Sequence, residues 1–367
     1  MSSGSGIGGV ILGVIGAVVG FVIGNVAGAY IGGMLGFGLG FGIGYAIDPI
    51  QADIGQAGAP IQKLQIPDNT VGSVIVDVLG TVKVSGTFLC FGLERAIPQY
   101  TKSGGKGGSS KKVVTGYKYY MSWAQGICLG PVDALYAIYK NNDEKLWSGT
   151  LTRPVSGGKE TISIDDHGSI TFYFGTDDQA ADSRVASIIG ESSLNSPFRG
   201  LCYAVMNNFY IGEFNRCPAL KFIVQKSPVI EELPDNNTIG YFDYNPAHAL
   251  WHVFNNMTGL PATWLDIDSF QEVAATLYTE ELGISVCFDQ HQTALTYLEG
   301  INAHADSIIK YGNDGKFHLK LIRGDYDTAA LPSIDENIVL DNPTLSRKSW
   351  IDTINEIKVQ YSEIYEV

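Results

Sequence analysis

The first 47 residues carry no charged side chain, and the first carboxylate is Asp48. Within this segment glycine recurs at every fourth position, between Val, Ile, Leu, Phe and Ala: Gly16, Gly20, Gly24, Gly28, Gly32, Gly36, Gly40 and Gly44. In a helix this spacing places the glycines along one face, where a second helix can approach to backbone contact. Glycine destabilises a helix by about 1 kcal/mol per position relative to alanine, so the segment needs neighbours. We therefore predict a self-associating glycine zipper in residues 1–48.

Two environments for this zipper stay open. Forty apolar residues are enough for a hairpin of two helices, each roughly 20 residues long and able to span a bilayer. Alternatively, the segment packs inside an oligomer and never meets lipid. A secretory signal peptide is not expected, because no positively charged region precedes the apolar run. Contact of residues 1–47 with a host membrane is therefore one hypothesis, and packing inside an oligomer is the other.

After Asp48 the pattern changes to short runs rich in β-branched and aromatic residues, which predict strands. The expected strands lie at 73–78, 81–89, 117–123, 134–139, 161–164, 170–174, 201–206 and 219–224. Leu79-Gly80 is expected to separate the first two, and Gly130-Pro131 to end the third. Residues 102–112, which read KSGGKGGSSKK, are expected to form a mobile loop. Residues 49–235 therefore predict a β-rich unit, either a barrel or a sandwich.

Helical periodicity follows. Asn245-Pro246 is typical of a helix start, and Ser269 with Glu272 forms a capping-box pattern before a second helix. A third helix is expected at 293–305, so residues 236–306 predict a small helical domain. Strands at 307–311, 316–323 and 355–361 then return, and we expect residues 307–367 to complete the β-rich unit. The predicted fold class is α+β, mainly β, with a three-helix insertion domain.

Charge and cysteine usage narrow the classes of function. The chain has 24 Lys and Arg against 38 Asp and Glu, a net charge of -14, so no specific nucleic-acid binding is expected. Its five cysteines are scattered without the spacing of a zinc site. They indicate buried thiols of a protein made in a reducing cytoplasm.

Candidate catalytic patterns are weak. His248 and His252 lie four residues apart on an expected helix, a spacing able to present two imidazoles to one metal. The glutamate of an H-E-x-x-H protease is absent between them, so a packing role is favoured. Residues 165–168, Asp-Asp-His-Gly, indicate a hairpin turn. The 102–112 segment lacks the G-x-x-x-x-G-K-[ST] pattern, and G-x-S-x-G is absent. We assign no catalytic residue, cofactor or metal ligand, and expect a protein that is not an enzyme.

Several segments are similar, in content and order, to hub proteins of siphophage tail tips and gene transfer agents. They lie at 79–89, 117–123, 124–132, 197–205, 214–218, 245–247, 314–316, 346–350 and 355–359. Their clearest runs are LGTVKVSGTFL, AQGICLGPV and PFRGLCYAV. The chain thus resembles the family that includes the lambda tail-tip J protein, in its N-terminal hub portion.

The resemblance implies tube-forming, barrel-like hub domains in a homotrimer at the tail tip of a virion assembled in the host cytoplasm. Expected partners are the distal tail protein, the tape-measure protein and receptor-binding or fibre proteins. The ring would surround or close the DNA-exit channel. The excess of carboxylates in the chain fits an acidic or neutral lumen along which DNA slides, and it fits equally a surface that its charge keeps soluble. Family members commonly continue beyond the 355–361 strand, so we expect host recognition to reside in another protein or in further sequence.

Two other functions stay open. The chain could be a membrane-inserting pore or anchor that acts through the glycine zipper during DNA delivery. A tail-associated peptidoglycan hydrolase is a less favoured alternative, because no recognisable catalytic motif supports it.

Overall fold

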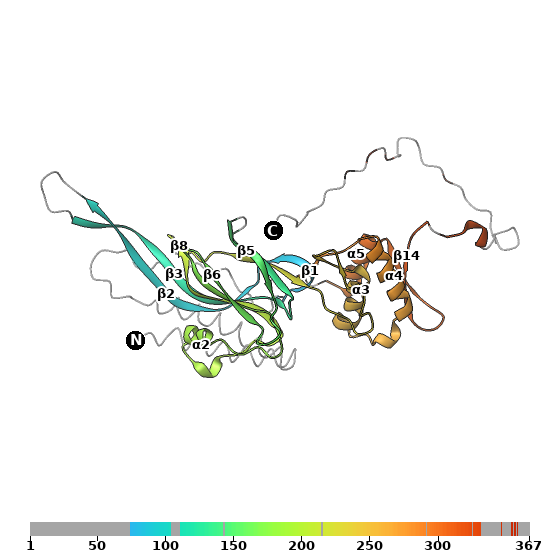
Figure 1. Cartoon of the computed structure of the whole chain (residues 1–367), viewed down its shortest axis with the longest axis horizontal. Helices are drawn as coiled ribbons and strands as arrows, with labels where there is room; N and C mark the ends of the chain where they lie inside the picture. The colour runs from blue at the N-terminus through green and yellow to red at the C-terminus, as the bar shows by residue number, and fades with distance from the viewer. Residues whose placement is uncertain are drawn as a thin grey trace.

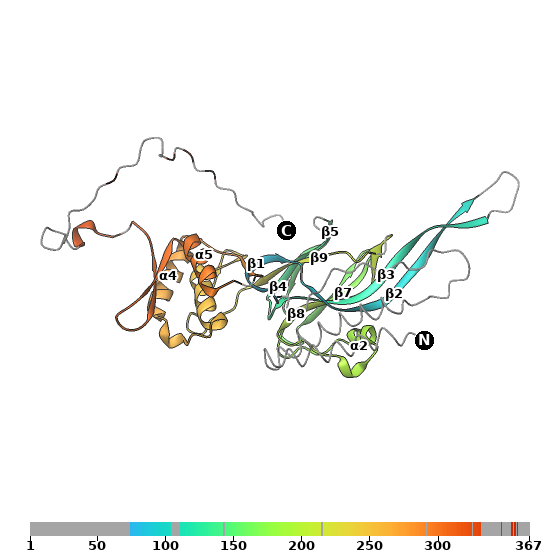
Figure 2. The same cartoon turned by 180° about the vertical axis from the view of Figure 1, so that it is seen from behind.

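The computed structural model describes residues 74–331, apart from 104–110, 142–143, 214–215, 291 and 325, together with positions 346, 354, 356 and 358. The predicted glycine zipper lies outside the described residues, as does most of the predicted strand at 355–361. Figures 1 and 2 show an elongated molecule, with a β body in the middle, a long two-stranded ribbon at one end and a helical unit at the other.

Two five-stranded antiparallel sheets form the β body. The first has the order β12-β1-β9-β4-β5 and consists of β1 (Asp77–Val84), β4 (Ala134–Lys140), β5 (Glu144–Thr152), β9 (Leu220–Lys226) and β12 (Val286–Phe288). The second has the order β2-β3-β8-β7-β6 and consists of β2 (Thr87–Ser103), β3 (Lys111–Leu129), β6 (Lys159–Ile164), β7 (Gly168–Tyr173) and β8 (Leu201–Gly212). Both sheets are open within the described residues. The expectation of a mainly β protein is confirmed, while closure into a barrel stays a prediction.

Alternate side chains of the two sheets form one core. Phe222 of β9 and Phe172 of β7 face each other with ring centroids 6.4 Å apart, and both are fully buried. Trp123 of β3 packs edge-on against Phe209 of β8 at 5.4 Å. Full burial of each such side chain contributes about 1.5–3 kcal/mol. The sheets are therefore held face to face by aromatic packing, as in a sandwich.

A short helix covers the outer face of the second sheet. Helix α2 (Ser183–Ile189) is capped by Asp182, whose carboxylate accepts from the Arg184 backbone N–H at 2.8 Å. Its buried Val185 and Ile188 pack on side chains of β2, β3, β7 and β8. A 3-10 turn, η1 (Ser192–Leu194), follows it. This helix was not predicted, because seven residues are too few for a clear period.

The helical unit has its own core. It contains α3 (Pro246–His252), which continues into the π-helical turn η2 (Val253–Met257), then η3 (Ala262–Trp264), α4 (Ile267–Thr279) and α5 (Ala294–Ala305). Two small antiparallel sheets complete it: β10 (Thr238–Ile239) with β11 (Asp243–Tyr244), and β13 (Ser307–Tyr311) with β14 (Phe317–Leu321). A last 3-10 turn is η4 (Thr328–Ala330). The three predicted helices are confirmed. No helix of the described residues is long and apolar enough to cross a bilayer.

The start of α4 differs from the capping-box prediction. Asp266 is the N-cap, and its carboxylate accepts from the Ser269 backbone N–H at 3.2 Å. Ser269 lies inside the first turn, where its hydroxyl donates back to the Asp266 carbonyl at 2.8 Å. The helix therefore begins at Ile267, because the Asp266 carboxylate caps its N-terminus in place of the Ser269 hydroxyl.

The first strand boundary also differs from the prediction. β1 continues through Leu79 and Gly80, and Gly80 is in register with Lys226 of β9. The chain turns instead at Gly86, whose φ of +61° is a left-handed conformation. A Cβ at Gly86 would also collide with the Gly126 carbonyl of β3. Glycine is required at this turn for both reasons.

The hairpin of β13 and β14 lies with the helices, although the sequence assigned residues 307–367 to the β-rich unit. Leu319 of β14 is buried in the core that contains Trp251, Phe270 and Leu298. Neither strand joins a five-stranded sheet in the part of the chain that the structure describes. Conversely, β12 comes from the helical part of the sequence and pairs with β1.

Candidate functional site

The predicted self-association residues of the glycine zipper, Gly16 to Gly44, lie outside the described residues, so that prediction stays untested. The predicted loop at 102–112 is described at its ends only. Lys102 and Ser103 of β2 pair with Lys112 and Lys111 of β3, so the ladder extends further into this segment than expected.

The two histidines of α3 have separate partners. His248 is fully buried, and its Nε2 lies 3.0 Å from the Leu233 carbonyl oxygen. Burial lowers the pKa of His248 despite this bond. His252 instead places its Nε2 2.9 Å from Oδ2 of Asp77 in β1. Each imidazole is therefore engaged in packing and hydrogen bonding, which agrees with the structural role expected from the sequence.

Asp77, Lys226 and His252 form a buried ionic joint between the β body and the helical unit. Lys226 Nζ lies 2.6 Å from Asp77 Oδ1 and also donates to the Leu129 carbonyl at 3.2 Å. The three residues are 8%, 6% and 7% exposed. Burial raises the pKa of Asp77, but the hydrogen bond from His252 and the charge of Lys226 outweigh it and lower the pKa below its ordinary value. Both oxygens of the buried Asp77 carboxylate therefore have a hydrogen-bond partner, which offsets the cost of burying its charge.

The joint has a positional role. His252 stacks on Phe288 of β12 at 6.4 Å, so the same imidazole also contacts the strand that extends the first sheet. Lys226 and His252 each contact one oxygen of Asp77, and a carboxylate so engaged is a poor general base. The ionic joint holds α3 against β1 and β9. Sequence reasoning missed it because Asp77 and His252 are 175 positions apart.

A second ionic cluster surrounds His318. Its Nδ1 lies 3.1 Å from Asp266 Oδ2, and its Nε2 lies 2.9 Å from Asp314 Oδ1. One imidazole nitrogen and one oxygen from each carboxylate lie within 4.8 Å of one another, so the three side chains could hold a metal ion. The hydrogen bond from His318 lowers the pKa of Asp314.

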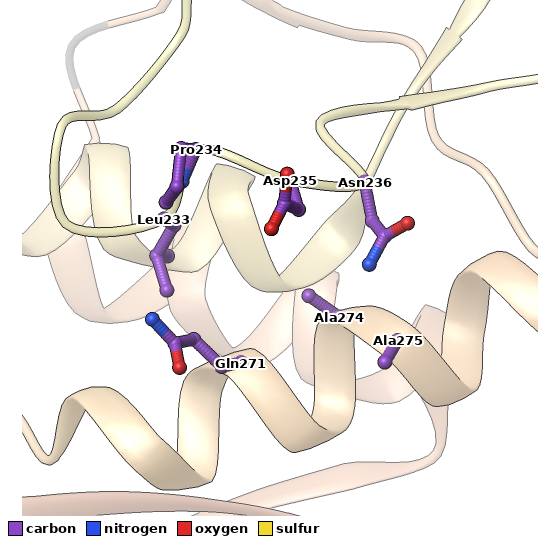
Figure 3. A pocket seen from close by; sticks show the side chains of 7 residues that line it. All are labelled: Leu233, Pro234, Asp235, Asn236, Gln271, Ala274 and Ala275. Atoms are coloured by element: carbon purple, nitrogen blue, oxygen red, sulfur yellow. The ribbon is translucent and has the colours of Figure 1, made fainter.

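A small pocket lies between α4 and the loop before β10. It measures about 240 Å³ and is lined by Leu233, Pro234, Asp235, Asn236, Gln271, Ala274 and Ala275 (Figure 3). Small-molecule sites usually measure roughly 300–1,000 Å³. This hollow therefore suits one protruding side chain better than a substrate. The Nε2 of Gln271 donates to the Glu232 carbonyl at 3.1 Å and ties the loop to α4.

The longest pair of strands in the described fold is the ribbon of β2 and β3. The pairing of β3 with β8 ends at Tyr119 and Gly212, whereas β2 and β3 continue together to Ser103 and Lys111. We name the strand residues 95–103 and 111–119 the arm; Figure 1 shows it projecting from the β body. Two-stranded ribbons are marginally stable alone.

No protein-family model matches this chain, and no curated protein sequence does. A solved chain described as part of the virion of a native gene transfer agent particle is similar to it at 15% sequence identity, with a TM-score of 0.45. The match covers 74% of this chain and 57% of that chain, so this chain corresponds to little more than half of the other's length. The similarity concerns the fold alone.

Proposed function

We propose that this chain is a structural virion protein, the central hub of a long-tailed phage tail tip. In this proposal a homotrimer joins the distal tail protein to receptor-binding or fibre parts and surrounds or closes the DNA-exit channel. The ordered run of sequence segments shared with tail-tip hub proteins, from 79–89 to 355–359, carries the proposal.

The positions of these segments in the fold support it. Segment 79–89 includes most of β1, the turn at Gly86 and the start of β2. Segment 124–132 includes the end of β3 and Gly130, where a Cβ would lie 2.6 Å from the Gly175 Cα. Glycines at such crowded positions are required by the backbone around them, so sharing them supports a shared fold rather than a similar amino-acid composition.

The open sheets also support assembly. The described edges are β12 and β5 in one sheet, and β2 and β6 in the other. Open edges leave backbone N–H and C=O groups available to another chain, and closure of several copies into a ring satisfies them. β5 is the clearest case, because most of its side chains are exposed.

The test is assembly of the purified chain with tail proteins. Size-exclusion chromatography with light scattering should give a trimer, and the trimer should bind the distal tail and tape-measure proteins. Cryo-EM of tail tips should then place it around the channel. A soluble monomer that binds none of these tail proteins would refute the proposed hub function.

A second candidate is a membrane-inserting pore or anchor, favoured by the uncharged segment 1–47 and its glycine spacing. Full-length protein and a variant lacking residues 1–47 would be compared for dye release from liposomes. Leakage that needs residues 1–47 supports insertion. If neither protein releases dye, and the variant lacking residues 1–47 no longer forms the oligomer, the zipper packs within the protein.

A further inference from the structure

Two of the five cysteines lie directly opposite each other in the second sheet. Cys128 of β3 is in register with Cys202 of β8, and the two strands are antiparallel. The register shifts between Gly126 and Cys128, so one extra residue of β3, Ile127, precedes the pair. Without this bulge Ile127 would face Cys202. The irregularity therefore brings the two cysteines together, although β4 to β7 lie between them in the sequence.

The backbone geometry suits a covalent bond between Cys128 and Cys202. Residues directly opposite each other in an antiparallel pair have Cα atoms about 4.5 or 5.5 Å apart, and their side chains point to the same face. Disulfides join residues whose Cα atoms are about 4.4–6.8 Å apart. Both cysteines are fully buried and belong to the core between the two sheets. The two sulfur atoms can therefore be joined without a large movement of either strand.

The two thiols already interact in the reduced protein. Burial, and then the hydrogen bond with Cys128, raise the pKa of the Cys202 thiol well above its ordinary value. The thiolate is the form that attacks a disulfide, so a thiol held protonated in this way reacts slowly. Reaction of the pair with an oxidant from solution therefore requires a local opening of the core.

The other three cysteines are less suited to bond with this pair. Cys287 lies in β12 of the first sheet, and facing sheets pack about 10 Å apart, which is longer than the Cα separation of a disulfide. Cys90 lies in the cluster beneath α2, on the outer face of the second sheet. Cys217 lies between β8 and β9. Among the five cysteines, all of which the structure describes, Cys128 and Cys202 are the two that face each other across a strand pair.

We propose that Cys128 and Cys202 form a disulfide when the protein meets an oxidising medium. An organic disulfide, such as oxidised glutathione, supplies the oxidation. One cysteine thiolate attacks it, forms a mixed disulfide and releases one glutathione thiolate. The second cysteine thiolate then attacks the protein sulfur of the mixed disulfide and releases the other glutathione. Two cysteine thiols are thus oxidised, one glutathione disulfide is reduced to two thiols, and the two cysteine protons end on these thiols.

The bond closes a loop that contains β4, β5, β6 and β7, which are strands of both sheets. A disulfide that closes a long loop restricts the unfolded chain and so favours the folded state. The adjacent Leu129 is also tied to the first sheet. Its N–H donates to the Val76 carbonyl at 2.8 Å, and its carbonyl accepts from Lys226 at 3.2 Å. Oxidation therefore stabilises the sandwich where it meets the helical unit.

The test is a redox titration of the reduced full-length protein in glutathione buffers of increasing oxidising strength. Urea below the unfolding transition lets the core open often enough for the thiols to react. After acid quenching, denaturation and alkylation, peptide mass spectrometry should show a disulfide between Cys128 and Cys202 and alkylated thiols at Cys90, Cys217 and Cys287. The oxidised protein should unfold at a higher urea concentration than the reduced protein, and dithiothreitol should abolish the difference.

Cys202→Ala and Cys90→Ala are matched variants, because each replaces a buried thiol of the second sheet. Oxidation should raise the urea midpoint of Cys90→Ala as it does in the wild type, and leave that of Cys202→Ala unchanged. Circular dichroism establishes that each variant is folded, and the peptide map of the wild type decides the inference if a variant is not. Thiols that stay free or carry only glutathione in the most oxidising buffer overturn the inference. So does a disulfide to Cys287, or an oxidised protein no more stable than the reduced one. These measurements use the isolated chain and do not depend on the proposed function.

Discussion

Lys226 Nζ of β9 lies 2.6 Å from Asp77 Oδ1 of β1, at the place where the sandwich meets the helical unit. Both side chains are almost fully buried. The geometry combines a short charge-assisted hydrogen bond with a second bond from Lys226 to the Leu129 carbonyl. Removing one partner would leave the other charge without compensation in a desolvated site.

Replacement of Lys226 by methionine should therefore destabilise the protein by about 3–5 kcal/mol, because Asp77 would stay buried without its cation. Urea unfolding measures the change. Arg153→Met is the matched control: Arg153 pairs with Asp133 at 3.0 Å, but both side chains are 36% exposed. An exposed pair contributes at most about 1 kcal/mol. Equal losses in the two variants would contradict the assignment of a buried joint.

His248 predicts a loss of stability in mild acid. Its pKa is lowered by burial, so the unfolded chain takes up a proton near the ordinary value of about 6.5 while the folded chain does not. Stability should then decrease as the pH falls from about 6.5 towards the folded pKa. His248→Gln should reduce this pH dependence in urea unfolding at several pH values. His304→Gln, at an exposed position, should keep the wild-type profile.

Gly86 predicts a steric effect that can be separated from backbone strain. Gly86→Ala and Gly200→Ala both place alanine at a positive φ, +61° and +76°. That conformation costs about 1–2 kcal/mol at each position. Only at Gly86 does the added Cβ meet a backbone carbonyl, that of Gly126, whereas nothing lies near it at Gly200. Thermal unfolding should show a distinctly larger loss for Gly86→Ala; similar losses would argue against the crowded turn.

Thiol labelling tests the expectation of buried cysteines. Cys90, Cys128, Cys202 and Cys217 are buried, and Cys287 is half-buried. Burial raises the pKa of Cys90 to about 12 and that of Cys287 to about 11, so few thiolates form at pH 8. An alkylating reagent should modify Cys287 slowly in the native protein and the other four only in urea. Fast native labelling that survives Cys287→Ser would refute this burial.

Local patterns predicted the three helices of the helical unit, because their determinants are local. Asn245 accepts from the Ala247 N–H at 3.0 Å and Thr293 caps α5, so each start is decided by residues adjacent in sequence. The strands of the sandwich core were found for the same reason, since buried β-branched and aromatic residues alternate along them.

The elements that were missed depend on distant partners. β5 is an exposed edge with few apolar residues, so its sequence lacks a strong alternation. β12 has only three residues and is a strand because β1 lies beside it. The ionic joint requires Asp77, Lys226 and His252 from three separate regions, and no spacing rule connects them.

The position of β12 has a consequence for dividing the protein. A cut near residue 235, between the two regions that the sequence suggests, would separate β1 from Cys287 and its neighbours, which pair with it in the first sheet. The remaining fragment would expose a new edge on β1. Deletion studies should therefore keep residues 74–288 together. A force applied to the helical unit would act on the backbone hydrogen bonds between β12 and β1.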